Sequence, residues 1–536
     1  MSDHDPRRPG DEAEEHRTPS RAVLIAAGNL LVVAACVYLV ARGMLLLWAE
    51  YKVADMILAI LLLLSEIFVM FHSLSFMIDL LSAARRRPPP IRGLDAANAP
   101  SVAVFVPARH EPRDVLDATF TCLENLDYPN KILYLLDDSS LPEYQKEAED
   151  VAATHGARLF RRPERRGAKA GIINDCLKTV DAKYIAILDC DQNPLPDFLR
   201  ATVPHLEANP RLAFVQTPQF YTNIATSAVA AAANLQHCIF YEYICEGKGK
   251  LGSMICCGTN DVIRKTALED VGGFDETSVT EDFSTSVDFQ MKGWESLYDG
   301  QVSVFGKGPE TLGPYLRQQW RWARGNIGVF KKILRCLLTH PRGMGFWRWW
   351  DYIATGTYYL IGWAYFFLML CPIMFVFFDI PSFFMRPEVY FLTFLPYFTL
   401  SVTLFYGSMG KRGYKLGQVL MAQALGFVAI PIYMMAAVSA LLNLKAAFTI
   451  TTKSKVRATP LRIIWPQVAL WLANYAAIVW AINRAVAERD PAILLSLVWI
   501  LYHFALLSAV FPFRYAGHEE KADVDPKNLD MEAARP

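Results

Sequence analysis

Long apolar stretches divide the chain into two groups that flank a more polar centre. Each stretch has about 20 residues, the length that an α-helix needs to cross the roughly 30 Å hydrocarbon core of a bilayer. Two stretches precede the centre and four follow it, so the pattern predicts six membrane spans. They cover residues 22–41, 56–80, 352–378, 388–408, 463–483 and 491–512.

The centre of the chain, residues 95–340, has another pattern. Short apolar runs at 102–107, 132–137 and 184–189 end in turn residues, and helical patterns separate them. Unbroken apolar runs of this length are typical of parallel strands that are buried on both faces. Alternation of strands and helices predicts an α/β domain, and such domains bind ligands at the carboxyl ends of their strands.

Basic residues in short loops indicate how the spans are oriented, because they stay on the cytoplasmic side. The arginines at 85–87 follow the second span, so we expect the α/β domain in the cytoplasm. Residues 417–444 are apolar enough for a further span, but basic residues both precede and follow this segment. This favours an interfacial or re-entrant segment, and both chain termini are then cytoplasmic.

The pattern therefore predicts seven segments. These are a disordered tail (1–21), two transmembrane helices (22–82), a cytosolic α/β domain with an interfacial helix (95–340), two transmembrane helices (345–410), an interfacial helix with a loop (411–460), two transmembrane helices (461–513) and a short cytosolic tail (514–536).

The composition supports a membrane protein and excludes some functions. Hydrophobic residues make up 53% of the chain and charged residues 20%, which is unusual for a soluble protein of this length. The formal net charge is zero, so no overall positive field argues for nucleic acid as a partner. The ten cysteines show no zinc-type spacing, which fits a reduced, cytosolic location of the α/β domain.

Acidic residues follow two of the predicted strands. Asp137 and Asp138 end the second strand, where carboxylates can accept hydrogen bonds from a uracil or a ribose; Asp is also a common turn former. Asp189 and Asp191 follow the third strand. Two carboxylates at this spacing can hold Mg²⁺ or Mn²⁺ against a diphosphate, although such pairs also occur by chance.

Two further motifs lie toward the second group of spans. Glu281 and Asp282 follow a Gly-rich turn, and a carboxylate there suits a general base for an acceptor hydroxyl. They are equally typical of the first turn of a helix capped by Thr280. Residues 318–322 read Gln-Gln-Trp-Arg-Trp, which suits sugar stacking and phosphate binding, but also a helix in the membrane interface.

Together and in this order, the four motifs resemble glycosyltransferase family 2 in its processive membrane branch. The family pattern is D, DxD, [ED]D and QxxRW. The resemblance implies a GT-A-type α/β glycosyltransferase domain inserted between α-helical transmembrane segments, about six spans plus interfacial helices. It also implies inversion at the anomeric carbon.

Other segments narrow the resemblance toward bacterial cellulose synthase catalytic subunits and curdlan-type β-glucan synthases. Residues 166–171 are similar to the HAKAGN segment, with Gly167 and Ile172 where the family usually has His and Asn. Residues 257–260 resemble the segment beside the acceptor sugar, and residues 448–453 match the FxVTxK gating loop with Ile for Val.

This resemblance implies a role for each matched residue. Asp282, Glu281 and Asp191 are expected to take part in catalysis. Asp189 and Asp191 are expected to bind a divalent cation, Mg²⁺ or Mn²⁺. Binding of the nucleotide sugar falls to Asp137, Asp138, Lys169, Asp189, Gln318, Arg321, Thr451 and Lys453. Binding of the acceptor falls to Trp322, Cys257, Gly258 and Thr259.

The expected function is polymerisation of glucose from UDP-glucose into a β-glucan that passes through the bacterial inner membrane. The linkage, β-1,3, β-1,4 or mixed, stays open. The expected partners are UDP-glucose, the growing polysaccharide, the lipid bilayer and, by resemblance alone, a periplasmic accessory subunit. The chain ends shortly after its last predicted span, so we expect no cyclic-di-GMP-binding PilZ domain.

Three alternatives stay open. A hyaluronan or chitin synthase would use UDP-N-acetyl sugars, and the gating-loop match argues against it. A non-processive lipid-linked glycosyltransferase would usually lack QxxRW. A transporter with a cytoplasmic regulatory domain would leave the acidic motifs unexplained.

Overall fold

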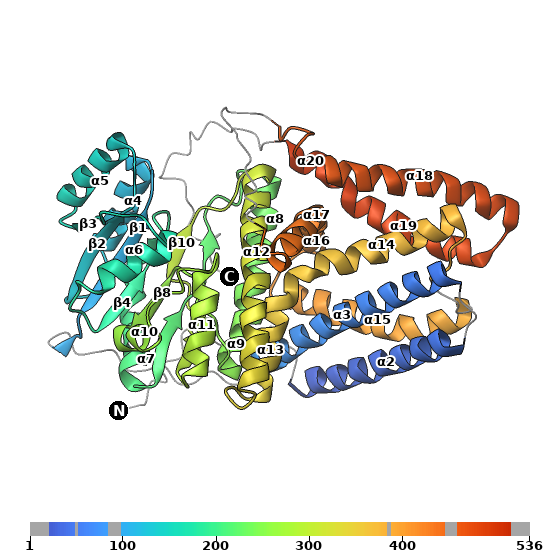
Figure 1. The fold of residues 1–536 in the computed structure, drawn as a ribbon, viewed down its shortest axis with the longest axis horizontal. Helices are drawn as coiled ribbons and strands as arrows, with labels where there is room; N and C mark the ends of the chain where they lie inside the picture. The colour runs from blue at the N-terminus through green and yellow to red at the C-terminus, as the bar shows by residue number, and fades with distance from the viewer. Residues whose placement is uncertain (1–20, 49–51, 84–97, 383–386, 445–457, 516–536) are drawn as a thin grey trace, which may run out of the picture.

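The computed structural model describes residues 21–48, 52–83, 98–382, 387–444 and 458–515. An α/β domain lies at one end of the molecule and a bundle of long helices at the other (Figure 1). Helices α12 (Leu312–Thr339) and α13 (Phe346–Thr357) lie along the boundary between the two parts. The expected fold class, an α/β domain between groups of apolar helices, is therefore confirmed.

A seven-stranded sheet forms the centre of the α/β domain, in the order β3-β2-β1-β4-β8-β6-β9. Strand β1 (Val102–Ala108) pairs in parallel with β2 (Lys131–Asp137) on one side and with β4 (Tyr184–Ile187) on the other. Because the chain leaves β1 toward one edge and later returns to its other side, the ends of β1 and β4 form a topological switch point. Sheets of this kind bind ligands at such a point.

The other strands complete this sheet and a smaller one. Strand β8 is antiparallel to both β4 and β6, whereas β3 is parallel to β2 and β9 is parallel to β6. A three-stranded sheet in the order β5-β10-β7 lies beside it. The bounds are β3 (Arg158–Phe160), β5 (Asn193–Pro194), β6 (Leu212–Gln216), β7 (Phe220–Tyr221), β8 (Asp261–Arg264), β9 (Glu295–Tyr298) and β10 (Val304–Gly306).

Alternate side chains of the central strands enter two hydrophobic cores, because successive residues of a strand point to opposite faces. Val102, Val104 and Val106 pack with helices α4 (Arg113–Glu124), α5 (Pro142–Thr154) and α7 (Phe198–Ala208) on one face. Ala103 and Phe105 pack on the other face. That face is covered by α6 (Ala168–Leu177), α10 (Lys265–Asp270) and α11 (Glu281–Met291).

Five helices or helix combinations in the described part are long and apolar enough to cross a membrane. They are α2 (Arg21–Trp48), α3 (Val53–Ala83), α13 with α14 (Ile361–Phe378), α15 (Pro387–Lys411), and α19 (Pro491–Ser508) with α20 (Val510–Arg514). Helix α18 (Trp465–Glu488) corresponds to the span expected at 463–483. It packs along α19 and has sufficient length but is less apolar than these five.

The segment expected to be interfacial forms two helices, α16 (Leu416–Val428) and α17 (Ile430–Leu441), which meet at an angle of 44°. Pro431 lies in the first turn of α17 and explains the break, because proline cannot donate the backbone hydrogen bond that would continue the helix. Helix α17 packs along the amphipathic helix α12. The bend is typical of a broken span or a re-entrant segment, so an interfacial position stays a prediction.

The α/β domain is joined to the membrane helices by a close contact and a buried ion pair. Helix α9 (Glu246–Leu251) packs on α3, and a Cβ atom added at Gly247 would lie 2.6 Å from the carbonyl oxygen of Asp79. The next residue, Lys248, donates to Asp351 Oδ1 and to Thr355 Oγ1 on α13, both at 2.6 Å. Its side chain is only 1% exposed, so the contact is dry.

We expect Gly247→Ala to lower the unfolding temperature relative to Gly328→Ala. The added methyl group at Gly247 would push α9 away from α3, whereas Gly328 on α12 has no atom within 4 Å of a new Cβ. Gly328→Ala should gain about 1 kcal/mol of helix propensity. Thermal unfolding of both purified variants in detergent measures the difference. Equal unfolding temperatures would contradict the conclusion that α9 and α3 pack too closely for a side chain at position 247.

Candidate active site

A cleft of about 450 Å³ opens at the carboxyl ends of β1, β2 and β4, at the switch point of the sheet. Its lining is mostly charged. Of the residues predicted from sequence, the cleft brings together Asp138, Lys169, Asp189, Asp191 and Arg321. These residues come from the ends of two strands, β2 and β4, and from two helices, so only folding makes them neighbours.

Lys169, in the first turn of α6, links two of the other segments. Its ammonium group forms an ion pair with Asp189, which follows β4, and donates to the carbonyl oxygen of Gly258 at 2.6 Å. Burial opposes the positive charge, but Asp189, Glu281 and Asp282 raise the pKa of Lys169 above its ordinary value. The lysine is therefore a permanent cation at the floor of the cleft.

Asp189 and Asp191 were predicted to hold a divalent cation. Burial raises the pKa of Asp191, and repulsion from Asp189 raises it further. A cation would relieve this repulsion. Mg²⁺ commonly uses one or two carboxylates together with phosphate oxygens, so the pair fits a metal that is shared with a diphosphate. Among the described residues, no group of three or more His, Cys, Asp and Glu side chains forms a metal site.

Asp282 lies at the start of α11, where its Oδ1 atom accepts a hydrogen bond from the backbone N–H of Phe283 at 2.7 Å. Burial raises the pKa of Asp282 to about 7, and the charge of Glu281 contributes in the same direction. A carboxyl group with this pKa can accept a proton at neutral pH. Thr280 precedes the helix, but its side chain makes no capping hydrogen bond.

The backbone at Gly258 leaves room for the Asp282 carboxylate. Gly258 has φ +78°, and an added Cβ would lie 2.7 Å from Asp282 Oδ2. Because the Gly258 carbonyl also accepts from Lys169, this glycine lies between the lysine and the acid. Only a residue without a side chain fits there.

The other two residues of the predicted acceptor segment make structural contacts. Thr259 is buried, and its Oγ1 atom accepts from the backbone N–H of Asp189 at 2.9 Å. The backbone N–H of Cys257 donates to Gln216 Oε1 at 2.8 Å. Thr259 therefore holds the end of β4 in place, and the acceptor-binding roles of both residues stay predictions.

The two acids at the end of β2 differ in their positions. Asp138 lines the cleft, whereas Asp137 is buried, accepts from Arg161 Nε at 2.7 Å and does not line it. Asp138 is itself paired with Arg162 and Arg165. Neither acid is therefore an unpaired acceptor for a nucleotide base.

The QxxRW motif lies on α12. Arg321 is exposed toward the cleft, while Gln318 lies beside Tyr221. The ring of Trp322 packs against the imidazole of His237, with centroids 5.6 Å apart. The hydroxyl of Tyr221 is hydrogen bonded to His237 Nε2 at 2.8 Å. Trp322 thus belongs to an aromatic cluster with His237 and Tyr221.

Sequence reasoning missed several residues of this region. Arg109, Glu111 and Arg165 line the cleft, and the position of Arg109 and Glu111 directly after the first strand was a usable signal. Burial raises the pKa of Glu111, and Asp191 and Asp189 raise it further. His237 carried no signal in the sequence; burial lowers its pKa to about 4, so it is neutral at physiological pH.

Two predicted residues cannot be placed. Thr451 and Lys453 lie within 445–457, outside the described residues, so their roles at the nucleotide stay predictions.

A larger cavity of about 640 Å³ lies among the apolar helices α2, α3, α14, α15, α16 and α19. Its wall is mainly apolar and rich in aromatic rings, with a few polar groups such as Glu66 and Gln423. Aromatic residues that line it include Tyr365, Tyr390, Phe394, Tyr397, Tyr406 and Trp499. Rings of this kind present flat apolar faces, and tyrosine adds a polar edge.

Comparison with known proteins agrees with these features. Residues 184–406 match the family described as Glycosyl transferase family group 2. Over 284 residues, 51% of this chain, the sequence is 34% identical to putative cellulose synthase 2 and 31% identical to the cellulose synthase 1 catalytic subunit [UDP-forming], both of Komagataeibacter xylinus. It is 31% identical over 280 residues to the cellulose synthase catalytic subunit of Xanthomonas axonopodis pv. citri.

These matches cover 18%, 37% and 37% of the respective relatives, so the chain spans well under half of their length. Among solved structures, a mannosyltransferase from Pyrobaculum calidifontis in complex with GDP-Man and Mn²⁺ has a TM-score of 0.50 and 20% identity. The likeness covers 71% of this chain and 100% of that chain, and it shows a common fold. The family resemblance expected from the motifs is confirmed.

We expect Asp191→Asn to weaken Mn²⁺ binding in the presence of UDP by about tenfold or more, because one of two anionic ligands is lost. Asp181→Asn is the matched control, since Asp181 is exposed and lies outside the cleft. Titration of Mn²⁺ followed by electron paramagnetic resonance measures both affinities. Equal affinities in the two variants would rule out Asp191 as a ligand.

Proposed function

Because the chain contains a glycosyl transferase family 2 domain and is homologous to bacterial cellulose synthase catalytic subunits at 30–34% identity, we propose that it is a processive, inverting glycosyltransferase. Its donor would be UDP-glucose and its product a β-glucan. The observation that carries this proposal is the cleft at the switch point, where Lys169, Asp189, Asp191 and Arg321 meet beside Asp282.

The charges of the cleft suit a nucleoside diphosphate. The cations of Lys169 and Arg321 would attract the diphosphate. Asp189 and Asp191 would hold Mg²⁺ or Mn²⁺, which supplies charge stabilisation to the leaving diphosphate. Arg109, directly after β1, and Arg165, which pairs with Asp138 after β2, add positive charge toward the nucleotide.

Asp282 is the proposed catalytic base, with Glu281 beside it. As the acceptor hydroxyl attacks the anomeric carbon, a new C–O bond forms and the hydroxyl proton passes to the Asp282 carboxylate. The bond from the anomeric carbon to the diphosphate breaks, and UDP leaves with the electron pair. Attack on the face opposite the diphosphate inverts the α-linked donor to a β-linked product.

The acceptor end of the glucan would stack on Trp322. This ring lies in an aromatic cluster with His237 and Tyr221, next to the membrane helices. An indole face suits the apolar face of a sugar ring. A cluster of packed rings is also rigid, so the acceptor hydroxyl would meet the donor in one orientation.

The product would pass through the membrane helices in an orientation with both termini and the α/β domain in the cytoplasm. The aromatic-lined cavity supports this proposal, because glucan chains combine apolar ring faces with polar edges. The six-span arrangement, the gating role of residues 445–457 and a periplasmic accessory subunit belong to the same proposal.

Purified protein in lipid nanodiscs, incubated with UDP-glucose and Mg²⁺, should release UDP and form a polymer. Digestion of the polymer with β-1,3-glucanase or β-1,4-glucanase then identifies the linkage. UDP-N-acetylglucosamine and GDP-mannose are tested as donors in parallel incubations. Turnover of an N-acetyl sugar alone would favour a hyaluronan- or chitin-type synthase, and formation of only a lipid-linked monosaccharide would exclude a processive enzyme.

The kcat/KM for the donor should depend on pH through Asp282. With a pKa raised to about 7, the carboxyl is protonated below that pH and cannot accept the acceptor proton. We expect kcat/KM to fall about tenfold per pH unit below 7, because it reports ionisations of the free enzyme. Asp282→Asn should lower kcat by at least about a hundredfold. A wild-type profile that is flat from pH 8 to pH 5 would contradict the assignment.

A further inference from the structure

The segment between β3 and α6 carries four arginines at the edge of the cleft. Arg161 pairs with Asp137, and the side chains of Arg165 and Arg166 are 43% and 48% exposed. Arg162 differs from the others because its side chain is only 3% exposed. A buried guanidinium keeps its charge and needs partners for all its N–H groups.

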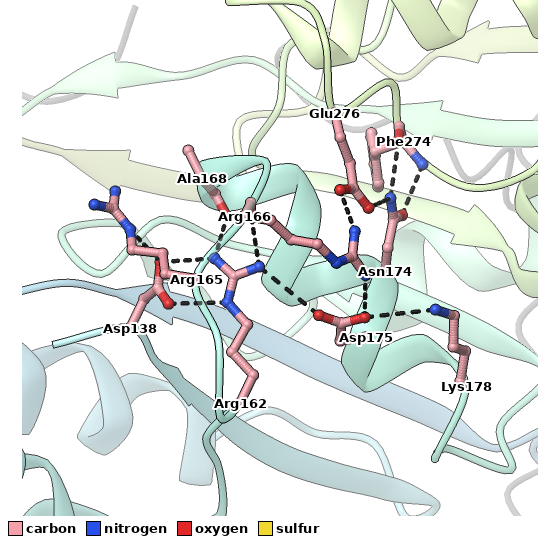
Figure 2. A network of polar contacts seen from close by, with 10 residues as sticks. All are labelled: Asp138, Arg162, Arg165, Arg166, Ala168, Asn174, Asp175, Lys178, Phe274 and Glu276. Atoms are coloured by element: carbon pink, nitrogen blue, oxygen red, sulfur yellow. Dashed lines mark hydrogen bonds and ion pairs between the residues drawn. The ribbon is translucent and has the colours of Figure 1, made fainter. Parts of the chain in front are cut away.

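Arg162 has such partners on every side, as Figure 2 shows. Its Nε and Nη2 atoms donate to the two carboxylate oxygens of Asp138 at 3.0 and 2.9 Å, a bidentate pair. Nη2 also donates to the carbonyl of Ala168 at 3.1 Å, and Nη1 donates to that of Arg166 at 2.5 Å. Nη1 further lies 3.8 Å from Asp175 Oδ2.

These contacts hold a strained backbone directly before Lys169. Gly167 and Ala168 have φ +58° and +44°, in a region that residues with a side chain rarely adopt. The helix also packs tightly on the guanidinium, since a Cβ added at Gly171 would lie 2.5 Å from Arg162 Nη1. Arg162 therefore sets where α6 begins, and hence where Lys169 points.

The other side of α6 is held by separate contacts. Arg166 forms ion pairs with Asp175 and Glu276, and Asn174 both donates to the carbonyl of Phe274 and accepts from its N–H, at 2.9 and 2.8 Å (Figure 2). The bonds of Asn174 do not involve Arg162, whereas Asp175 is shared between Arg162 and Arg166. The segment that leads to α11 and Asp282 is thus tied to α6 independently.

The pairing also changes the role of Asp138. A carboxylate has about four acceptor positions, and Arg162 fills two of them while Arg165 Nε fills a third at 2.9 Å. Asp138 thus acts mainly as an anchor for two arginines. The cationic side of the cleft depends on this anchor.

We propose that Arg162 is a positioning residue that fixes both Asp138 and Lys169 for binding of a nucleoside diphosphate. The identity of this ligand rests on the proposed function. Lysine could not replace Arg162, because a single ammonium group cannot form the bidentate pair and reach two carbonyls at the same time.

The test compares Arg162→Lys and Asp138→Asn with the control Arg200→Lys. Arg200 pairs with Asp127 on the surface, and its side chain is 59% exposed. Binding of UDP, GDP and ADP to the full chain in nanodiscs with Mg²⁺ is measured by calorimetry, together with KM and kcat for the donor. Arg162→Lys should weaken nucleotide binding and raise KM by about tenfold, because Asp138 and Lys169 would lose the bidentate pair and carbonyl contacts that fix them. The control should stay within twofold.

Two further readouts separate positioning from general stability. The Arg162→Lys/Asp138→Asn double variant should bind about as weakly as the weaker single variant, because both changes remove the same contact. The pH midpoint of kcat/KM should rise in Arg162→Lys, because burial already raises the pKa of Asp282 and a displaced Lys169 would no longer oppose that shift. If Arg162→Lys does not fold, Asp138→Asn tests the proposal instead, and it should likewise weaken nucleotide binding and raise KM by about tenfold.

The proposal is overturned if Arg162→Lys keeps nucleotide affinity and KM within twofold of the wild type, or if the two changes are fully additive. A wild-type protein that binds GDP or ADP but not UDP would overturn the proposed donor instead. The affinities of the Arg162 variants would then be compared with that of the wild type for the nucleotide that binds.

Discussion

The candidate site depends on one partly buried cation, Lys169. Its ammonium group binds Asp189 after β4 and the carbonyl of Gly258, and it compensates the charges of Glu281 and Asp282. Without this cation, the carboxylates after β4 and those at the start of α11 would repel one another across the cleft. The lysine therefore allows strand β4, the segment at Gly258 and helix α11 to approach closely enough to share one ligand.

The same principle joins the α/β domain to the membrane helices. Lys248 pairs with Asp351 at a dry contact between α9 and α13, and Gly247 lets α9 approach α3. Removing one partner of a buried pair usually costs about 3–5 kcal/mol, because the other charge is left without compensation. The contacts hold the domain in a defined position against the helices, which a synthase that passes its product into the membrane would need.

Much of the fold followed from local patterns. The buried runs at 102–107, 132–137 and 184–189 correspond to β1, β2 and β4, because unbroken apolar runs of this length fit few other structures. The membrane positions of helix α18 and of the bent pair α16 and α17 were harder to predict. Helix α18 has only moderate hydropathy, and a proline breaks the pair, so a membrane-crossing helix and an interfacial helix look similar in these sequences. The order of the strands in the sheet needed long-range pairing and could not be read from any local segment.

What the sequence determined by itself was the set of elements and the kind of chemistry: buried strands that end in acids, apolar helices of membrane length and motifs of a glycosyltransferase. Only the tertiary structure decided which of these acids face the cleft. Asp137 and Asp138 are adjacent and chemically identical, yet Asp137 is buried against Arg161 while Asp138 lines the cleft and anchors Arg162. Neighbouring residues at a strand end point in opposite directions, and the partners they meet come from distant parts of the chain.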